Sequence, residues 1–240
     1  MQIDRDLCIG CESCVPYCPV GAIKFEDGTA YIEYDECVEC GVCRRLADCP
    51  VDAINESDDV LTWPRSVRKA FSDPTVKHED TGVRGRGTEE VKTNDVTARF
   101  KRGFYGMAME FGRPGVGTRL YEVEPVTKAL AAAGVKFEAK NPLTTLMTDP
   151  EVGEIKEEVR NERVLSAIIE FIVPEERLEE LVESVLAAAK ETSTVFSWCL
   201  VSRFATDGSL PVMERLNKLG IQLPQHMKVN VGLGLPRGEE

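Results

Sequence analysis

The sequence predicts an α+β protein in two parts: a small cysteine-rich domain made of two similar halves, then a larger α+β sandwich domain. Eight of the nine cysteines lie between Cys8 and Cys49, an internal repeat covers the same region, and periodic apolar segments resume in the second half of the chain. A length of 240 residues suits one or two domains. We expect a cysteine-rich domain over residues 1–60, a connecting loop over 61–95 and a sandwich domain over 96–240.

The cysteine-rich region contains two copies of one pattern. Residues 8–23 read CIGCESCVPYCPVGAI, and residues 37–54 read CVECGVCRRLADCPVDAI. In each copy a Cys-Pro-Val-x-Ala-Ile segment follows three closely spaced cysteines. A short β-like stretch precedes each copy, at Gln2–Ile3 and at residues 30–34. Such a repeat predicts two half-domains related by pseudo-symmetry.

The connecting segment is basic and irregular, with one short helix expected at residues 66–71. Its glycine cluster, which indicates a loop, consists of Gly82, Gly85 and Gly87. The spacing matches neither the P-loop nor the GxGxxG pattern, because Glu90 occupies the third glycine position.

Positive side chains in this loop suggest an anion site. Arg84, Arg86 and Lys92 form a candidate loop for a phosphate or a carboxylate. The alternative is that the basic segment lies against the acidic N-terminal region of its own chain.

The larger domain is expected to alternate strands and helices. The predicted elements are an extended segment or hairpin at 97–111, a helix at 125–133 closed by Gly134, strands at 135–138 and 165–173, an amphipathic helix from 174 to about 190, a strand at 195–204, a helix at 210–219 closed by Gly220, and a strand at 227–233. Pro174 is expected at the first helical position, with Glu175 and Glu176 in the first turn. This order fits a sandwich of the ferredoxin-like kind, a fold that is named for its topology and needs no iron.

Charge and hydropathy exclude several classes of protein. The chain has 41 acidic and 29 basic side chains, and its pI near 4.9 argues against a nucleic-acid binder. The first ten residues lack the apolar region of a secretory signal. The longest apolar run, 164–173, is too short to span a bilayer. We expect a cytoplasmic protein without membrane insertion.

The cysteine spacing carries the chemistry. The two blocks are Cys8-x2-Cys11-x2-Cys14-x3-Cys18-Pro19 and Cys37-x2-Cys40-x2-Cys43-x5-Cys49-Pro50. Clustered cysteines in a cytosolic protein favour metal ligation over disulfides. The first block resembles the motif of bacterial two-cluster ferredoxins residue for residue, and the second has a last gap two residues longer. Eight cysteines could also hold two zinc ions, but this spacing is more specific to iron–sulfur clusters.

The resemblance implies an N-terminal ferredoxin domain with two [4Fe–4S] clusters and crossed ligation. Following the family, one cluster is held by Cys8, Cys11, Cys14 and Cys49, and the other by Cys37, Cys40, Cys43 and Cys18. The longer gap alters the loop that leads to Cys49. Two adjacent clusters make a one-electron relay, for which the protein supplies binding, insulation and tuning of the potential.

The acidic N-terminal region suggests how a partner is recognised. Residues 1–60 carry 14 acidic and 4 basic side chains. The acidic shell comprises Glu12, Glu26, Asp27, Glu33, Asp35, Glu36 and Glu39. It would steer the domain toward a redox partner protein with a basic docking surface. For any single residue, the alternative is that the charge only keeps the domain soluble.

A second resemblance covers residues 85–117, GRGTEEVKTNDVTARFKRGFYGMAMEFGRPGVG. This run is similar to a segment of iron–sulfur reductases of the 6-hydroxynicotinate reductase type, which reduce unsaturated rings in anaerobes with ferredoxin as donor. The chain has no evident flavin-binding motif, so a subunit or an electron-relay homologue is favoured over a complete reductase.

No catalytic residue is predicted. His78 and His226 are far apart in sequence, and residues 96–240 show no nucleophile–base constellation. Cys199 lies in an apolar run and is expected to be a small buried residue, and Met107 and Met109 are expected in the core.

Three functions follow as hypotheses. The first is an electron-transfer protein carrying low-potential electrons to or within an anaerobic oxidoreductase complex. The second is a catalytic or substrate-binding subunit of an iron–sulfur reductase that acts on an unsaturated small molecule. The third is a redox- or ligand-sensing regulator. Sandwich domains also form homo-oligomers by sheet extension, which is a further expectation for residues 96–240.

Overall fold

The N-terminal part of the computed structural model contains two short antiparallel strand pairs. The structure describes residues 1–82, 84, 100–113 and 115–227. The pairs are β1 (Gln2–Ile3) with β4 (Ile54–Asn55), and β2 (Ile23–Glu26) with β3 (Thr29–Ile32). Asp27 and Gly28 join β2 to β3 with positive φ at both residues, as a two-residue type I′ turn requires.

The two halves of this part make matching backbone contacts. The amide of Asp4 donates to the carbonyl of Ala53, and the amide of Glu33 donates to that of Ala22, both at 2.8 Å. Positive φ values also occur at equivalent positions of the two cysteine blocks: Gly10 and Glu39, Glu12 and Gly41, and Gly21 and Asp52. The half-domains predicted from the repeat are therefore present.

The extra two residues of the second block change one helical turn. Before Cys18 the chain forms a 3-10 turn, η1 (Val15–Tyr17), whereas before Cys49 it forms a short α-helix, α1 (Val42–Leu46). The strands on either side stay paired, so the insertion is absorbed locally.

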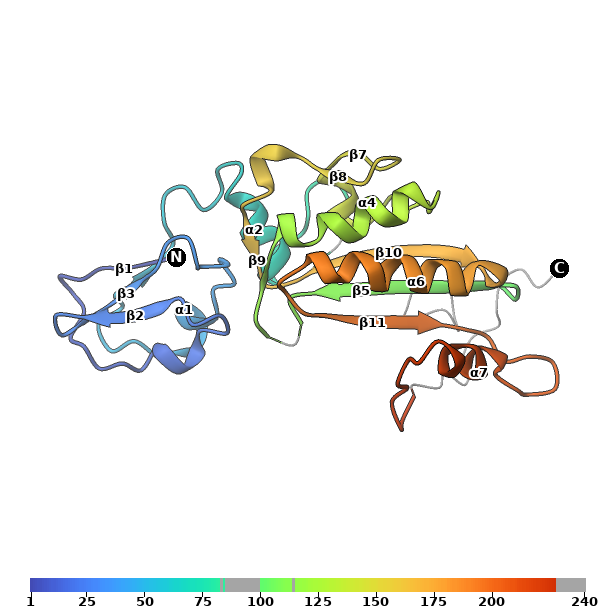
Figure 1. The fold of residues 1–240 in the computed structure, drawn as a ribbon. Coiled ribbons are helices and arrows are strands. Elements are labelled where there is room, and N and C mark those ends of the chain that lie inside the picture. Colours follow the sequence, from blue (N-terminus) through green and yellow to red (C-terminus); the bar gives the residue numbers. More distant parts are fainter. Residues whose placement is uncertain (83, 85–99, 114, 228–240) are drawn as a thin grey trace.

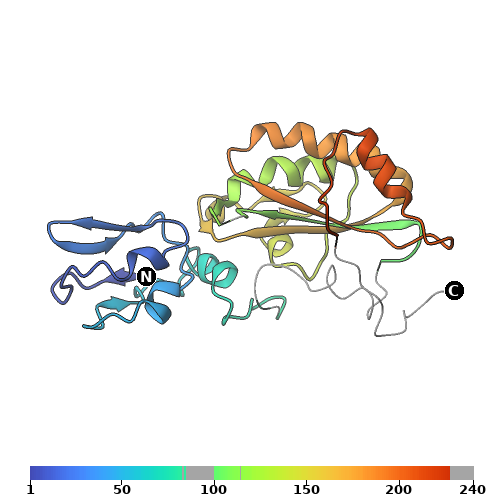
Figure 2. The same ribbon diagram turned by 90° about the horizontal axis from the view of Figure 1, so that it is seen from below.

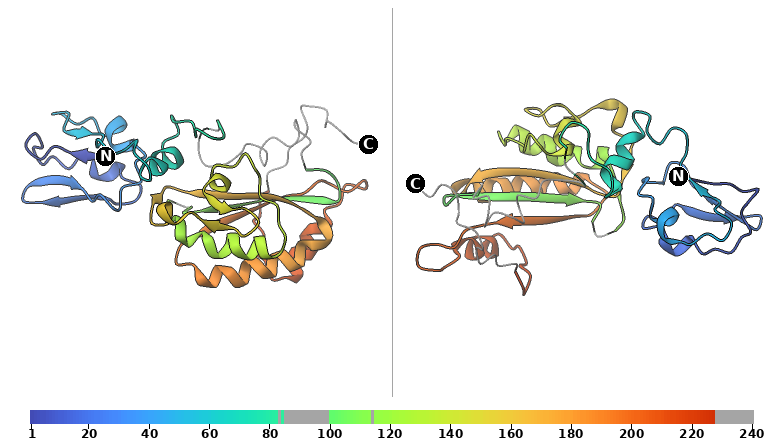
Figure 3. Two further views of the ribbon diagram at one scale, coloured as in Figure 1. Left: turned by 90° about the horizontal axis from the view of Figure 1, so that it is seen from above. Right: turned by 180° about the vertical axis from the view of Figure 1, so that it is seen from behind.

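A helix at α2 (Ser66–Ser72), predicted at residues 66–71, lies between the N-terminal part and the larger domain (Figure 1, Figure 3). Its Val67 and Phe71 are buried in the core of the larger domain. Further along, Lys77 and Arg84 form an isolated antiparallel bridge. The rest of the Gly-rich loop, including Arg86 and Lys92, lies outside the described residues.

The larger domain is centred on a three-stranded antiparallel sheet. Its order is β10 (Ala167–Pro174), β5 (Phe104–Phe111), β11 (Phe196–Val201). Met107 in the central strand faces Phe171 on one side and Leu200 on the other. The first strand in sequence is therefore the middle strand of the sheet.

Helices cover one face of this sheet (Figure 2). They are α4 (Glu124–Ala132), α6 (Leu178–Ala188) and α7 (Pro211–Lys218). Alternate residues of β5 point toward them and are almost fully buried: Tyr105, Met107, Met109 and Phe111. The predicted core positions Met107 and Met109 are thus confirmed, and the helix predicted at 125–133 ends before Gly134 in the left-handed conformation, at φ 72°.

Short elements complete the domain. β6 (Thr118–Arg119) pairs with β9 (Arg163–Val164), and β7 (Met147–Asp149) pairs with β8 (Glu154–Ile155). The remaining helical pieces are α5 (Pro142–Thr145), η2 (Leu120–Glu122), η3 (Glu157–Val159), η4 (Glu175–Arg177) and η5 (Ala189–Glu191).

Some predicted elements differ from the structure. Residues 135–138 meet the sheet only through a bridge between Phe137 and Phe171, because the chain turns away at Asn141, which caps α5. Pro174 ends β10 instead of opening a helix, and a 3-10 turn separates it from α6. A proline at a strand end removes no ladder hydrogen bond, so both positions suit it.

The outer ends of two predicted segments lie partly beyond the described residues. Within residues 100–111 there is one strand and no hairpin. Of the predicted strand 227–233, only Met227 is described, and it belongs to no strand. None of the described helices combines the length and apolar character needed to span a lipid bilayer.

Candidate functional site

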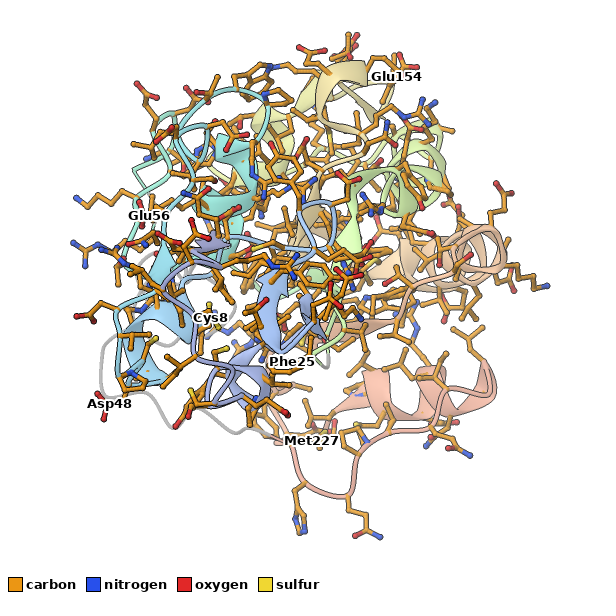
Figure 4. The ribbon with its side chains drawn as sticks, turned by 90° about the vertical axis from the view of Figure 1, so that its left-hand side faces the viewer. Cys8, Phe25, Asp48, Glu56, Glu154 and Met227 are labelled. Atoms are coloured by element: carbon orange, nitrogen blue, oxygen red, sulfur yellow. The ribbon has the colours of Figure 1, made fainter. Side chains whose placement is uncertain are left out.

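Four cysteines line a cavity on one side of the N-terminal domain. The four cysteines are Cys8, Cys11, Cys14 and Cys49, and we call this group the first site. Its other walls are mainly apolar: Ile3, Ile9, Ala30, Val51, Ala53 and Ile54. Figure 4 looks onto this end of the molecule, with Cys8 in the part nearest the viewer.

The other four cysteines line a second cavity, which we call the second site. Its cysteines are Cys18, Cys37, Cys40 and Cys43. Each block thus gives three cysteines to one cavity and its fourth to the other. This is the grouping that the motif implies, and ligation by these thiolates stays a prediction.

Backbone amides point at the sulfur atoms in both sites. The amide of Ala22 donates to Cys18 Sγ at 3.1 Å, and the amide of Ala53 donates to Cys49 Sγ at 3.4 Å. Both alanines belong to the repeated Cys-Pro-Val-x-Ala-Ile segment, which turns back over the cysteine through a residue with positive φ. Such donors stabilise negative charge on the sulfur atoms.

The two sites differ in exposure to solvent. Cys11 of the first site is exposed, and a hydrogen bond from the Ser13 hydroxyl lowers the pKa of its thiol. In the second site Cys37, Cys40 and Cys43 are all buried. Burial raises the pKa of each of these thiols, and that of Cys43 to about 12. Without a positive centre the second site would therefore hold neutral thiols.

The donor set fits an iron–sulfur cluster in each site. Thiolates are the protein ligands of [4Fe–4S] clusters, and a coordinated thiol is deprotonated by the metal charge. The apolar walls exclude water, and the amide donors balance negative charge. Among the described residues, no three His, Cys, Asp or Glu side chains gather as the ligands of a single metal ion.

Comparisons with known proteins match this part of the chain. The family described as a 4Fe-4S binding domain matches residues 1–24. A 7Fe ferredoxin from Hydrogenibacillus schlegelii is 46% identical over 65 residues, which are 26% of this chain and 81% of the relative. Through this segment, the chain belongs to the ferredoxins. Its N-terminal domain is a 4Fe–4S ferredoxin domain with an iron–sulfur electron-transfer function.

Two further relatives are subunits of larger enzymes. Pyruvate synthase subunit PorD from Methanothermobacter marburgensis is 44% identical over 52 residues, 22% of this chain and 58% of the relative. A subunit of an ion-translocating oxidoreductase complex from Methanosarcina acetivorans is 45% identical over 47 residues, 20% of this chain and 17% of the relative. The chain spans less than two thirds of the length of either of these two relatives. No solved structure matches the chain.

Arginines of α2 and the residue before it hold the ferredoxin domain. Arg68 donates to the carbonyls of Tyr34 at 3.2 Å and of Asp35 and Cys37 at 2.9 Å, and it pairs with Glu162 of the larger domain. Sequence reasoning missed this role. The signal that could have found it was the spacing of Arg65 and Arg68, three residues apart next to a predicted helix.

Five of the seven residues in the acidic shell predicted from the sequence are exposed on the surface. Glu39 is buried and pairs with Arg65 and with the Met1 amine. Glu36 pairs with Arg119 and Arg163 of the larger domain. The other five predicted shell residues are exposed: Glu12, Glu26, Asp27, Glu33 and Asp35.

The candidate anion loop is described only at Arg84, which is exposed. The other two residues of this candidate loop, Arg86 and Lys92, lie outside the described residues. Nearer to the domain, Lys69 of the basic segment pairs with Glu56, and Asp73 pairs with Arg45. The described part of the connecting segment is thus bound to the ferredoxin domain by ion pairs.

Cys199 is exposed, so the prediction of a buried residue was wrong. On β11, Phe196, Trp198 and Leu200 pack against the core, and Cys199 alternates with them on the opposite face. The run is apolar throughout, so its hydropathy did not reveal which residues face the core.

Proposed function

We propose that the chain carries low-potential electrons through two [4Fe–4S] clusters, to or within an oxidoreductase complex of anaerobic metabolism. The observation that carries this proposal is the division of eight cysteines into two cavities, with four cysteines lining each. Cys8, Cys11, Cys14 and Cys49 would hold one cluster, and Cys18, Cys37, Cys40 and Cys43 the other. A bound cluster of this type supplies a one-electron carrier.

The fold places the two sites next to each other. Cys14 lines the first cavity and Cys18 the second, and only the 3-10 turn η1 separates them. At about 2 Å of rise per residue, four residues of such a turn span about 8 Å. Two carriers held this close form a single path through the ferredoxin domain.

A basic partner surface is the proposed docking partner. The five exposed acidic residues of the shell favour such a surface by complementary charge. The names of two relatives, subunits of a pyruvate synthase and of an ion-translocating oxidoreductase complex, favour a subunit role. One electron per cluster would enter from a low-potential donor protein and leave to the acceptor in the complex.

We propose further that residues 96–240 form a ferredoxin-like sandwich. The bridge between Phe137 and Phe171 adds residues 135–138 beside β10. The resulting order, β11-β5-β10 and then this segment, with antiparallel neighbours, is that of a split β-α-β pair. In the described residues β11 has one neighbouring strand, so the predicted homo-oligomer would use this edge.

A second candidate function is a substrate-binding subunit of an iron–sulfur reductase. One observation favours it: Gly117, the last residue of the second resemblance, lies next to Val20 of the ferredoxin domain. A Cβ built on Gly117 would lie 3.1 Å from Val20 Cγ1. Co-purification of an organic cofactor or substrate with the chain would support this function over a plain relay.

An anaerobic redox titration tests the relay. The cluster-loaded chain should take up about two electrons, one for each cluster, at negative potentials within the range of about −700 to +450 mV that iron–sulfur clusters span. Cys199→Ser should behave as the wild type, since Cys199 lines neither cavity. Uptake of one electron or none, or potentials in the positive range, would contradict the proposal.

A further inference from the structure

The internal repeat allows the surroundings of the two sites to be compared position by position. The segment before Cys37 corresponds to the segment before Cys8, so Glu36 occupies the place that Leu7 has in the first half. Leu7 is half exposed to solvent. Glu36, in contrast, is bound by two arginines that come from the larger domain. Two arginines thus lie next to the residue that precedes the first cysteine of the second site.

Arg163 is one of the two arginines that bind Glu36 beside the second site. It lies on β9, and its side chain is 17% exposed. Its guanidinium pairs with Glu36 and donates to the carbonyl of Val116 at 2.9 Å. These two contacts fix its position.

Gly117 lies next to both Arg163 and the wall of the second site. A Cβ built on Gly117 would lie 3.1 Å from Val20 Cγ1 and 3.5 Å from Arg163 Nε. Val20 lines the second cavity, two residues after Cys18. Gly117 also has a φ of 70°, which a residue with a side chain rarely adopts. Arg163 therefore lies close to the wall of the second site.

The guanidinium of Arg163 places a positive charge near the wall of the second site. Burial lowers the pKa of Arg163, while the negative groups of Cys18 and Glu33 oppose this shift. An arginine stays protonated in proteins, so its charge is permanent. Arg119 adds a second positive charge, donating to Glu36 at 2.9 Å, so two guanidinium groups face one carboxylate.

We propose that the positive charge of Arg163 raises the reduction potential of the second cluster relative to the first. This inference rests on the two-cluster function proposed above. Reduction adds negative charge, and a fixed positive charge in a partly buried place stabilises the reduced state. Burial of Cys37, Cys40 and Cys43 acts in the opposite direction, because it disfavours added charge. Arg163 offsets that effect and favours electrons on the side facing the larger domain.

The test is a potentiometric titration of the cluster-loaded full chain, followed by electron paramagnetic resonance. Arg163→Gln should lower one of the two potentials and leave the other unchanged. Arg163→Lys keeps the charge and should restore most of the wild-type value. Arg177→Gln removes an arginine of the same domain that pairs with Glu180, and should shift neither potential.

The outcomes separate this inference from the proposed function. A wild-type chain that binds only one cluster contradicts the two-cluster function itself. Two clusters whose potentials are the same in Arg163→Gln and wild type overturn the inference alone. If Arg163→Gln fails to load the second cluster, Glu36→Gln decides: loss of this negative charge should raise the same potential, and an unchanged value overturns the inference.

Discussion

The first and second sites are built from the same cysteine pattern and differ in what covers them. Cys11 of the first site reaches solvent, whereas three cysteines of the second site are buried. Arg68, Arg119 and Arg163 bind the segment before Cys37, and the corresponding segment before Cys8 ends in the exposed Leu7. The repeat sets the local geometry of the cysteines, and the rest of the chain makes the two copies unequal. One site is thus open to solvent at Cys11, and the other faces the chain's own larger domain.

The largest effect should come from removing one ligand from each site in turn. Cys11→Ser and Cys40→Ser should each lose about four of eight iron atoms, because each removes a thiolate from a different cavity. Iron and sulfide analysis of protein purified without oxygen measures this. Cys199→Ser is the control and should keep all of its iron. Loss of all iron in both variants would mean that the sites do not load separately.

Among changes outside the cysteines, removal of Arg68 should cause the largest loss of stability around the second site. Arg68→Ala leaves Glu162 without its buried partner and frees three carbonyls. We expect a loss of about 3–5 kcal/mol in the free energy of unfolding, measured by urea denaturation followed by circular dichroism.

A matched control is Arg44→Ala, which removes an exposed arginine paired with Glu56. It should change the free energy of unfolding by less than about 1 kcal/mol. Equal losses in the two variants would contradict the view that α2 holds the second site in place.

Cys199 should be the one cysteine that alkylating reagents reach in the cluster-loaded chain. Partial burial and the negative charge of Glu110 raise the pKa of its thiol. The thiolate fraction at neutral pH is therefore small, and the rate of modification should rise only above the usual thiol range of about 8.5. Peptide mapping after iodoacetamide treatment between about pH 7 and pH 10 checks this. A rate profile equal to that of a free cysteine peptide would contradict the raised pKa.

The smallest expected effect is a change in reduction potential confined to the first site. The Ser13 hydroxyl donates to Cys11 and stabilises negative charge on its sulfur. Ser13→Ala should slightly lower the potential of the first cluster and leave that of the second unchanged. A titration of this variant beside Arg163→Gln would show one shift in each of the two potentials. A shift of the same potential in both variants would contradict the view that Ser13 and Arg163 act on different clusters.

Spacing and periodicity predicted much of this molecule. The cysteine motif, through its resemblance to two-cluster ferredoxins, implied the grouping of cysteines that the two cavities show. The stripe of α6 and the glycines after α4 and α7 predicted those helices closely. These are local features, in which a few neighbouring residues determine the backbone.

Contacts between distant segments could not be read in the same way. The pairing of Glu36 with Arg163 joins residues far apart in the chain. From its charge alone, Glu36 was predicted to belong to the acidic surface. Glu39 stands between two predicted ligands, yet it is buried against Arg65. The prediction that Cys199 is buried was wrong for a different reason: an apolar run does not show which alternate residues face the core.

The most direct test of the central claim is native mass spectrometry of the full chain purified without oxygen. The account predicts a mass increase equal to two [4Fe–4S] clusters for the wild type and for Cys199→Ser. It predicts one cluster for Cys11→Ser and one for Cys40→Ser. A wild-type chain carrying a single cluster, or two zinc ions in place of clusters, would contradict it.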